Sequence, residues 1–440
     1  MARRKIGSRD PTVRLVLTKM SVVQWSAPGG RALRLAYRRQ LMVENNEGAV
    51  AAMPTVVSER SNQFTESVIR DMTRQIQQYH GSDGINLAQG FPDFPAPAIV
   101  KDAACAAIQN DDNQYSITWG SRAFRTGIAE KTRHFYGVEV DPEREVTVCC
   151  GSTETMLSTL LAVVNPGDEV VIIAPYYENY WPDVILAGAA PRFVSLRAPD
   201  WRIDPDELRA AFSLRTKAIV VNTPNNPSGR VFDHAELQLI ANLCQEFDSL
   251  AITDEIYEHL VYEGVHHSIL SFPGMRNRTV AISGLSKSYS VTGWRVGYAV
   301  AAPPITDAIR KVHDFVTVGA PAPLQAAGAV AMGLPDSYYV DLLAKYRERR
   351  DFLIGHLQRL GFGCESPQGA YYVMCDFRTF GFDDDAAFAL YLVKDIGVAV
   401  VPGTSFYHDK SIGRHRVRFS FCKRLETLQR AVDRLDALRP

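Results

Sequence analysis

The sequence predicts an α/β protein whose central sheet is mostly parallel and is covered by helices on both faces. Seven short apolar, β-branched runs carry this prediction, at residues 145–150, 169–174, 192–195, 218–221, 251–254, 279–283 and 296–301. Helix-length segments separate most of these runs, which is the pattern of strands buried on two sides. Because ligands bind outside the carboxyl ends of the strands in such sheets, motifs that follow these runs are candidates for a functional site.

The composition is that of a globular enzyme. The chain has 440 residues, of which 46% are hydrophobic and 22% are charged, and this length suits two or three domains. A formal net charge of -1 gives no reason to expect nucleic acid or an anionic membrane as a partner, and no apolar run reaches the roughly 18 residues of a membrane span. The seven cysteines form no C-x-x-C pair and have no metal-ligand spacing, which predicts reduced, mostly buried thiols, no bound metal and a cytoplasmic location.

The N-terminal segment differs in character from the rest of the chain. Its first 42 residues hold ten Lys or Arg against one acid, Asp10. Three interpretations stay open: an organelle transit peptide, a basic arm, or upstream sequence attached by a wrongly assigned start. The last is favoured, because Met53 begins a passage of ordinary character. We therefore expect residues 1–53 to lie outside the fold.

A helix, an extended run and a second helix come next. Apolar residues recur at helical spacing over 63–79, and Ser61 or Asn62 is positioned to cap that helix. Pro and Gly predict an irregular, extended conformation for N-L-A-Q-G-F-P-D-F-P at 86–95. Residues 98–110 are expected to be helical, and a polar turn that includes Tyr115 follows them.

The turn after the first predicted strand carries Gly151, Ser152 and Thr153 and begins a helical run to residue 164. Backbone N–H groups at a helix N-terminus attract anions. Ser and Thr are also common helix caps, so these residues are compatible with an anion site, with an ordinary cap, or with both.

Two further motifs follow predicted strands. P-Y-Y-E-N-Y-W at 175–181 holds aromatic side chains that can stack on a flat heteroaromatic ring or pack in the core, and Tyr180 and Trp181 are candidate pocket walls. N-T-P-N-N-P-S-G at 222–229 is a turn-rich run.

Asp254 ends the predicted strand at 251–254, and Tyr257 lies on the turn that follows it. A carboxylate there needs a cationic partner unless it caps a following helix.

The loop between the last two predicted strands, S-G-L-S-K-S-Y-S-V-T-G-W-R-V-G-Y at 283–298, holds Lys287 and, eight residues later, Arg295. A loop between core strands presents side chains on a rigid scaffold. Taken alone, Lys287 would be interpreted as a solvated surface charge. A partly desolvated setting beside Arg295 would instead lower its pKa and provide a neutral, nucleophilic amine.

This loop resembles the Schiff-base lysine segment of the class I/II aminotransferases, which use pyridoxal 5'-phosphate on the type I fold, and the resemblance covers about residues 60–440. It implies that Lys287 holds the cofactor and is the catalytic acid and base. It assigns cofactor binding to Ser152, Thr153, Tyr177, Asn226, Asp254, Tyr257, Ser286 and Arg295, with Tyr115 reaching the phosphate in the neighbouring subunit of a homodimer. It assigns substrate binding to Gly90, Asn226 and Arg418, with Arg416 as the alternative to Arg418.

The sequence departs from the family pattern at Gly284, where many members have a hydroxyl that binds the cofactor phosphate. Ser283 and Ser286 are the two candidate substitutes. The resemblance also implies a joining segment at 54–98, a large cofactor-binding domain at 99–330 and a small α+β domain at 331–440. In the small domain we expect a helix at 336–360, a strand at 370–376, a helix at 384–396, strands at 398–401 and 416–421, and a last helix.

The implied activity is transfer of an amino group from an L-amino acid to a 2-oxo acid, most like the kynurenine, glutamine and methionine transaminase branch. Neutral, aromatic or sulfur-containing donors are expected, because the passages 86–95, 113–120, 175–181 and 315–325 hold no Lys or Arg. The expected apolar walls are Phe91, Phe94, Trp119, Tyr180 and Trp181. The alternatives are an aspartate aminotransferase, a cysteine-conjugate β-lyase on the same scaffold and, more distantly, a non-catalytic cofactor-sensing regulator.

Overall fold

A seven-stranded sheet lies at the centre of the computed structural model, which describes residues 58–438. In spatial order its strands are β2 (Val146–Cys149), β8 (Gly297–Ala301), β7 (Thr279–Gly284), β6 (Leu250–Asp254), β5 (Thr216–Asn222), β3 (Glu169–Ala174) and β4 (Ala190–Ser195). β8 runs antiparallel to both of its neighbours, and all other pairs are parallel. The predicted mostly parallel sheet is confirmed, and each of the seven predicted runs forms one of its strands.

Burial on both faces explains why these strands are continuous apolar runs. β2, β3 and β8 are buried at every position. β3 begins with a buried acid, Glu169, whose charge is compensated by ion pairs with Arg192 and Arg215. The carboxyl ends of β5 and β6 are level, since Asn222 pairs with Asp254, and β7 continues two residues past Ile282, the partner of Asp254. Side chains that follow these strands therefore meet at one edge of the sheet.

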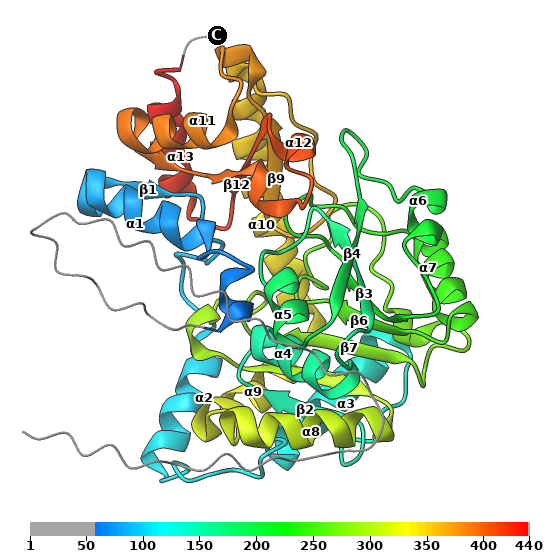
Figure 1. The fold of residues 1–440 in the computed structure, drawn as a ribbon. Coiled ribbons are helices and arrows are strands. Elements are labelled where there is room, and N and C mark those ends of the chain that lie inside the picture. The colour runs from blue at the N-terminus through cyan, green and yellow to red at the C-terminus, as the bar shows by residue number, and fades with distance from the viewer. Residues whose placement is uncertain (1–57, 439–440) are drawn as a thin grey trace, which may run out of the picture. The chain divides into compact units, whose positions relative to one another are not determined.

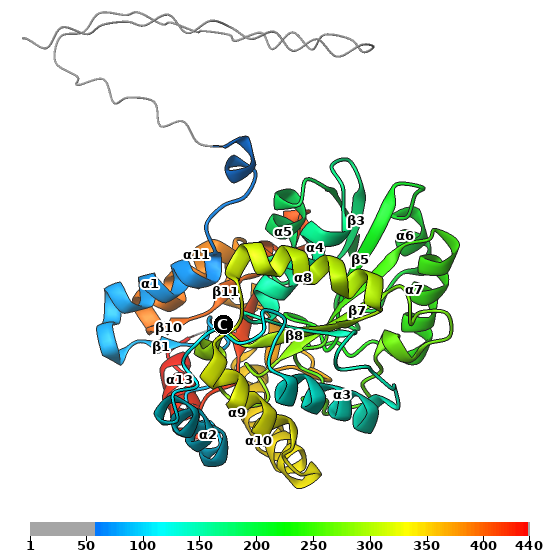
Figure 2. The same ribbon diagram turned by 90° about the horizontal axis from the view of Figure 1, so that it is seen from below.

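Helices cover both faces of the sheet (Figures 1 and 2). They are α2 (Ala98–Gln109), α3 (Arg122–Tyr136), α4 (Ser152–Val163), α5 (Tyr180–Leu186), α6 (Pro205–Ala210), α7 (His234–Glu246), α8 (Pro303–Thr317) and α9 (Ala322–Met332), with short turns η3 (Ile269–Ser271) and η4 (Thr292–Trp294). Figure 2 shows α4 and α8 on one side of β7 and β8 and α3 on the other. None of the helices between residues 58 and 438 is both long and apolar enough to cross a membrane.

The C-terminal part adds a second, smaller sheet in which β12 lies between β11 and β9 and is antiparallel to both. Its elements are α10 (Asp336–Leu360), β9 (Tyr372–Asp376), η5 (Arg378–Phe380), α11 (Asp385–Tyr391), the π-helical turn η6 (Leu392–Ile396), β10 (Val398–Ala399), β11 (Val401–Pro402), η7 (Gly403–Phe406), α12 (Lys410–Gly413), β12 (Arg416–Ser420) and α13 (Leu425–Leu435). The helices predicted for this part are present, and so are the strands predicted at 370–376 and 416–421.

The N-terminal elements pack against this C-terminal part (Figure 1). They are η1 (Glu59–Asn62), α1 (Val68–His80), η2 (Gly81–Asp83) and β1 (Ile85–Asn86). β1 pairs in parallel with β10, and the buried face of α1 is made of Ile69, Met72 and Ile76. The division into domains at 54–98, 99–330 and 331–440 stays a prediction, and the expected extension at residues 1–53 lies outside the described residues.

Two local predictions were wrong. The first helix begins at Val68, not at residue 63, because the Ser67 hydroxyl accepts the Arg70 N–H at 3.3 Å and Glu178 accepts the Val68 N–H at 3.2 Å. The strand expected at 398–401 is two strands, because the chain changes partner: β10 pairs with β1, and β11 pairs with β12.

Candidate active site

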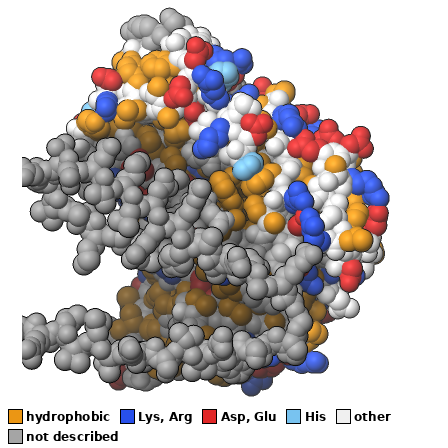
Figure 3. Space-filling view, viewed as in Figure 1, with side chains coloured by type: hydrophobic (Ala, Val, Ile, Leu, Met, Phe, Trp, Pro, Cys, Tyr) orange, Lys and Arg blue, Asp and Glu red, His pale blue; other side chains and the backbone are white. Residues whose placement is uncertain are grey.

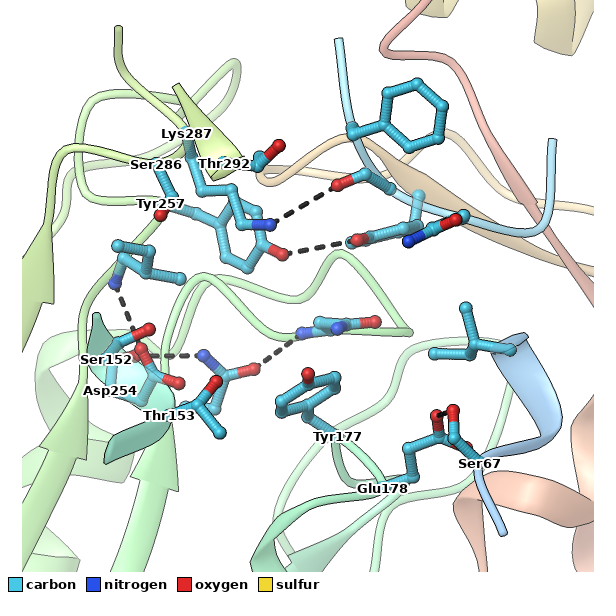
Figure 4. Close-up of a pocket in the computed structure, with 18 of the residues that line it drawn as sticks. Ser67, Ser152, Thr153, Tyr177, Glu178, Asp254, Tyr257, Ser286, Lys287 and Thr292 are labelled. Atoms are coloured by element: carbon cyan, nitrogen blue, oxygen red, sulfur yellow. Dashed lines mark hydrogen bonds between the residues drawn. The ribbon is translucent and has the colours of Figure 1, made fainter. Parts of the chain in front are cut away.

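A pocket of about 520 Å³ opens where β5, β6 and β7 end (Figure 4). The residues that line it are Ser67, Ile69, Arg70, Gln89, Gly90, Phe91, Ser152, Thr153, Tyr177, Glu178, Tyr180, Asn222, Asn226, Asp254, Ile256, Tyr257, Ser286, Lys287, Thr292, Gly293, Arg295 and Tyr372. Ten of the twelve predicted site residues are in this set, so the strand ends bring together motifs that are far apart in the sequence. The other two are Tyr115 and Arg418.

Lys287 stands on the loop between β7 and β8. Its Nζ donates to the carbonyl of Gly90 at 3.3 Å, and no acid forms an ion pair with it in the described part of the chain. Burial, reinforced by the charge of Arg295, lowers the pKa of Lys287 to about 8. Near pH 8 a large share of this amine is therefore neutral, as a nucleophile must be.

Asp254 ends β6 beside Asn222. The Tyr180 hydroxyl donates to its Oδ2 at 2.7 Å, and the N–H of Ile256 donates to its Oδ1 at 3.3 Å. Burial raises the pKa of Asp254, and the Tyr180 hydrogen bond opposes that shift. No Lys, Arg or His among residues 58–438 forms an ion pair with this carboxylate. The cap alternative is wrong, because turns, not a helix, follow β6.

The N-terminus of α4 faces Arg295. Gly151, the N-cap residue, has φ of +87° and offers no side-chain cap, which leaves the first N–H groups of the helix open. A Cβ on Gly151 would lie 2.6 Å from Nη2 of Arg295, so only glycine allows this approach. Arg295 is held by the carbonyl of Thr292 at 2.9 Å and reaches Oγ1 of Thr153 at 3.5 Å. Two hydroxyls, Ser152 and Thr153, complete a site for an anion.

The structure decides between the two substitutes for the hydroxyl missing at Gly284. A Cβ at Gly284 would lie 2.8 Å from the carbonyl oxygen of Val296, so no serine fits there. The Ser283 hydroxyl instead donates to Glu258, which also pairs with Lys131 on the buried side of β7. Ser286 lines the pocket. Ser286 is therefore the hydroxyl that can contact an anion in the pocket.

Arg418 is fully buried on β12, behind the pocket wall. Its Nη1 donates to Oδ1 of Asn226 at 2.9 Å, Nη2 donates to the carbonyl of Ala88, and the guanidinium carbon lies 4.2 Å from the ring centre of Tyr372. Its Nε has no hydrogen-bond partner in the described chain. Arg416, the alternative candidate, lies over the ring of Trp201 instead and does not line the pocket.

Gly90 lines the pocket next to Lys287. Its carbonyl also accepts a hydrogen bond from Tyr371 at 2.8 Å, and a Cβ on Gly90 would overlap the hydroxyl of Tyr372. The hydroxyls of Tyr257 and Tyr372 lie 3.3 Å apart. Figure 4 shows Tyr257 beside Lys287 and Tyr177 across the open space from them.

The expected apolar walls are only partly present. Phe91 and Tyr180 line the pocket, whereas Phe94 packs against Tyr346, Trp119 lies under Arg310, and Trp181 packs against Phe193. Tyr115 is 87% exposed and lies outside the pocket of its own chain. Sequence reasoning missed Ser67, Arg70 and Tyr372, which no local motif marks, because α1 and β9 reach the pocket only through tertiary packing. Glu178 lies within the motif at 175–181 but was given no role.

These observations define a class of enzyme. The pocket joins a lysine of lowered pKa, a buried carboxylate with no cationic partner among residues 58–438, and a helix N-terminus beside an arginine. Pyridoxal 5'-phosphate carries an aldehyde, a protonable ring nitrogen and a phosphate, which fit those three features in turn. The fold and the pocket are those of a pyridoxal-phosphate enzyme of the type I fold.

The chain belongs to the family described as aminotransferase class I and II, whose sequence profile matches residues 82–435. It is 38% identical over 366 residues to a probable N-succinyldiaminopimelate aminotransferase of Mycobacterium tuberculosis, covering 80% of this chain and 92% of the relative. It is 33% identical to the methionine aminotransferase of Escherichia coli (88% and 99% covered) and 37% identical to human kynurenine–oxoglutarate transaminase 1 (80% and 92%).

Solved structures agree with the fold. The N-succinyldiaminopimelate aminotransferase of Mycobacterium tuberculosis superposes with a TM-score of 0.84 at 36% identity, covering 87% of this chain and all of that one. The aspartate aminotransferase of Thermus thermophilus with maleate superposes with a TM-score of 0.81 at 33% identity, covering 86% and 98%. The protein is therefore an aminotransferase that uses pyridoxal 5'-phosphate, an amino acid and a 2-oxo acid.

Proposed function

We propose that this aminotransferase takes its amino group from a neutral, aromatic or sulfur-containing L-amino acid. The observation that carries the site assignment is that Lys287 and Asp254 share one pocket and neither has a counter-ion among the described residues. The family relatives named for methionine and kynurenine support the donor class. Phe91, Tyr177 and Tyr180 give the pocket aromatic surface on which such side chains can be buried.

The roles of the residues follow from their chemistry. Lys287 holds the cofactor through Nζ and, once the amino acid has released it, moves a proton at the same atom. When bound, pyridoxal 5'-phosphate supplies the electron sink that lets the Cα proton leave. With the cofactor bound, Asp254 would keep its ring nitrogen protonated, Asn226 and Tyr257 would donate to its phenolic oxygen, and Tyr177 would stack on its ring.

The two anionic groups are bound at separate places. The phosphate is held by Ser152, Thr153, Ser286 and Arg295, around the open N-terminus of α4. Arg418 takes the substrate α-carboxylate, and the unpartnered Nε of its buried guanidinium supports this role because a buried donor without an acceptor is costly. The backbone of Gly90 lines the same end of the pocket.

A donor screen tests the proposed function. We expect methionine, phenylalanine, kynurenine or glutamine to give higher kcat/KM than aspartate with a common set of 2-oxo acids, because the second carboxylate of so short a donor would lose its hydration among the aromatic side chains without a cationic partner. N-succinyldiaminopimelate belongs in the same screen, because a relative is named for it. The highest kcat/KM on aspartate would overturn the donor class, and pyruvate release without any acceptor would indicate the β-lyase alternative.

A homodimer with shared sites forms part of this proposal. Exposed apolar side chains gather on α2, the loop after it and the end of α8, namely Ile99, Ile108, Tyr115, Ile117, Phe315, Val316 and Val318. Figure 3 shows hydrophobic side chains gathered over the part of this face that holds α2 and α8. His313 of α8 lies 3.0 Å from the carbonyl of Thr118, so the loop and the helix are adjacent. A partner subunit would cover this patch and receive Tyr115.

We expect sedimentation to give twice the chain mass of 48.9 kDa and Phe315→Glu to shift the protein toward the monomer with loss of activity. Phe315 is 92% exposed, and Leu214, 96% exposed in the loop before β5, is the matched control. Leu214→Glu should leave both mass and activity unchanged. A wild-type protein that sediments as an active monomer would contradict the shared site.

A cytoplasmic location remains a prediction from the free thiols.

A further inference from the structure

Arg70 is a cation in the pocket to which the proposed chemistry gives no role. It lies in the first turn of α1, is exposed, and lines the pocket together with Ser67 and Ile69. The other pocket-lining cations are Lys287 and Arg295, which the cofactor occupies in the proposed function. No carboxylate between residues 58 and 438 forms an ion pair with Arg70, and its guanidinium makes no hydrogen bond there; its backbone N–H donates to the Ser67 hydroxyl.

Helix stability does not explain this arginine. Ser67 is the N-cap of α1, so Arg70 occupies the third helical position, where the helix dipole disfavours a cation. Arg74, one turn later, is a contrast, because it pairs with Glu66 at 2.8 Å and with Asp71 at 3.1 Å. Arg74 stabilises the start of the helix, and Arg70 does not.

The neighbouring acid does not neutralise Arg70 either. Glu178 also lines the pocket, but one of its oxygens accepts from the Ser67 hydroxyl and the other from the N–H of Val68 at 3.2 Å. Figure 4 shows Glu178 and Ser67 joined in this way at the edge of the pocket. Both oxygens of Glu178 thus hold the N-terminus of α1, which leaves the guanidinium of Arg70 available to a ligand.

We propose that Arg70 binds the second carboxylate of the amino-group acceptor, a 2-oxo dicarboxylic acid. This inference rests on the proposed function, in which Arg418 takes the first carboxylate of the substrate. A guanidinium matches a carboxylate with two parallel hydrogen bonds. Because Arg70 is exposed, it stays hydrated when a neutral donor occupies the pocket, so one site serves an uncharged donor and a doubly charged acceptor in turn.

The experiment compares two acceptors, 2-oxoglutarate and 2-oxohexanoate, which have similar chains but differ in the second carboxylate. With the donor held fixed, Arg70→Gln should lower kcat/KM for 2-oxoglutarate about tenfold, mainly through KM, and change it less than about twofold for 2-oxohexanoate. Arg70→Lys should restore part of the loss. Arg74→Gln is the matched control on the same helix, and it should leave kcat/KM unchanged for both acceptors.

Binding gives a readout that does not depend on turnover. Glutarate should bind the wild-type holoenzyme more tightly than hexanoate in calorimetry, and Arg70→Gln should remove that difference. Equal losses for both acceptors, or no loss for 2-oxoglutarate, would overturn the assignment. If the wild-type enzyme transferred no amino group to any acceptor, the proposed function would fail, and the glutarate comparison would still decide the role of Arg70.

Discussion

Replacing Asp254 with asparagine is expected to lower kcat by about a thousandfold while the protein still binds its cofactor. The carboxylate is buried at the end of β6 with no cationic partner in the described chain, so a protonated ring nitrogen is the charge that would complete it. An amide cannot hold that proton, and the electron sink is lost. The phosphate contacts of Ser152 and Arg295 lie elsewhere and would keep the cofactor in place.

The measurement is kcat with the best donor, together with the cofactor content of the purified variant. Tyr180→Phe is the matched control, because it removes the hydroxyl that donates to Oδ2 of Asp254 at 2.7 Å but keeps the negative charge. We expect about a tenfold loss in that control. Near-normal turnover in Asp254→Asn would mean that another group protonates the ring nitrogen.

Much of the candidate site could be predicted because a parallel sheet converts strand order into proximity. Asp254 ends one continuous apolar run and Lys287 follows another, and both runs end at the same edge of the sheet. The family resemblance then assigned a role to each motif. What could not be read from the sequence is which residues of other elements reach that edge. Periodicity places Ile69, Met72 and Ile76 on the buried face of α1, but it does not show that Arg70 meets the pocket.

The choice between neighbouring residues also needed the fold. Both Ser283 and Ser286 are possible substitutes by sequence, and only the structure shows that the Ser283 hydroxyl donates to Glu258, which pairs with Lys131. Arg416 and Arg418 project from the same side of β12, because successive side chains in a strand alternate. Their neighbours separate them: Arg416 lies over Trp201, whereas Arg418 is next to Asn226.

Replacing Lys287 with alanine is expected to lower kcat by on the order of 10⁴-fold or more, because the residue both holds the cofactor and moves the proton. Borohydride should fix the cofactor covalently on Lys287 in the wild-type protein, as peptide mass mapping would show, and the label should vanish in the variant. Lys423 is the matched control. It is buried, and its Nζ donates to the carbonyl of Phe91 at 2.8 Å, yet Lys423→Met should keep the label on Lys287.

The pH dependence of this labelling distinguishes Lys287 from a surface lysine. Its pKa is lowered to about 8, so the amine is mostly protonated and unreactive below that pH and mostly neutral above it. The rate at which the apoenzyme takes up the cofactor covalently should therefore rise about tenfold from pH 7 to pH 9 and begin to level off above pH 8. A lysine with its ordinary pKa of 10.5 would show a rate that climbs through pH 9 without levelling off. That profile, or a label on any other lysine, would contradict the assignment of Lys287.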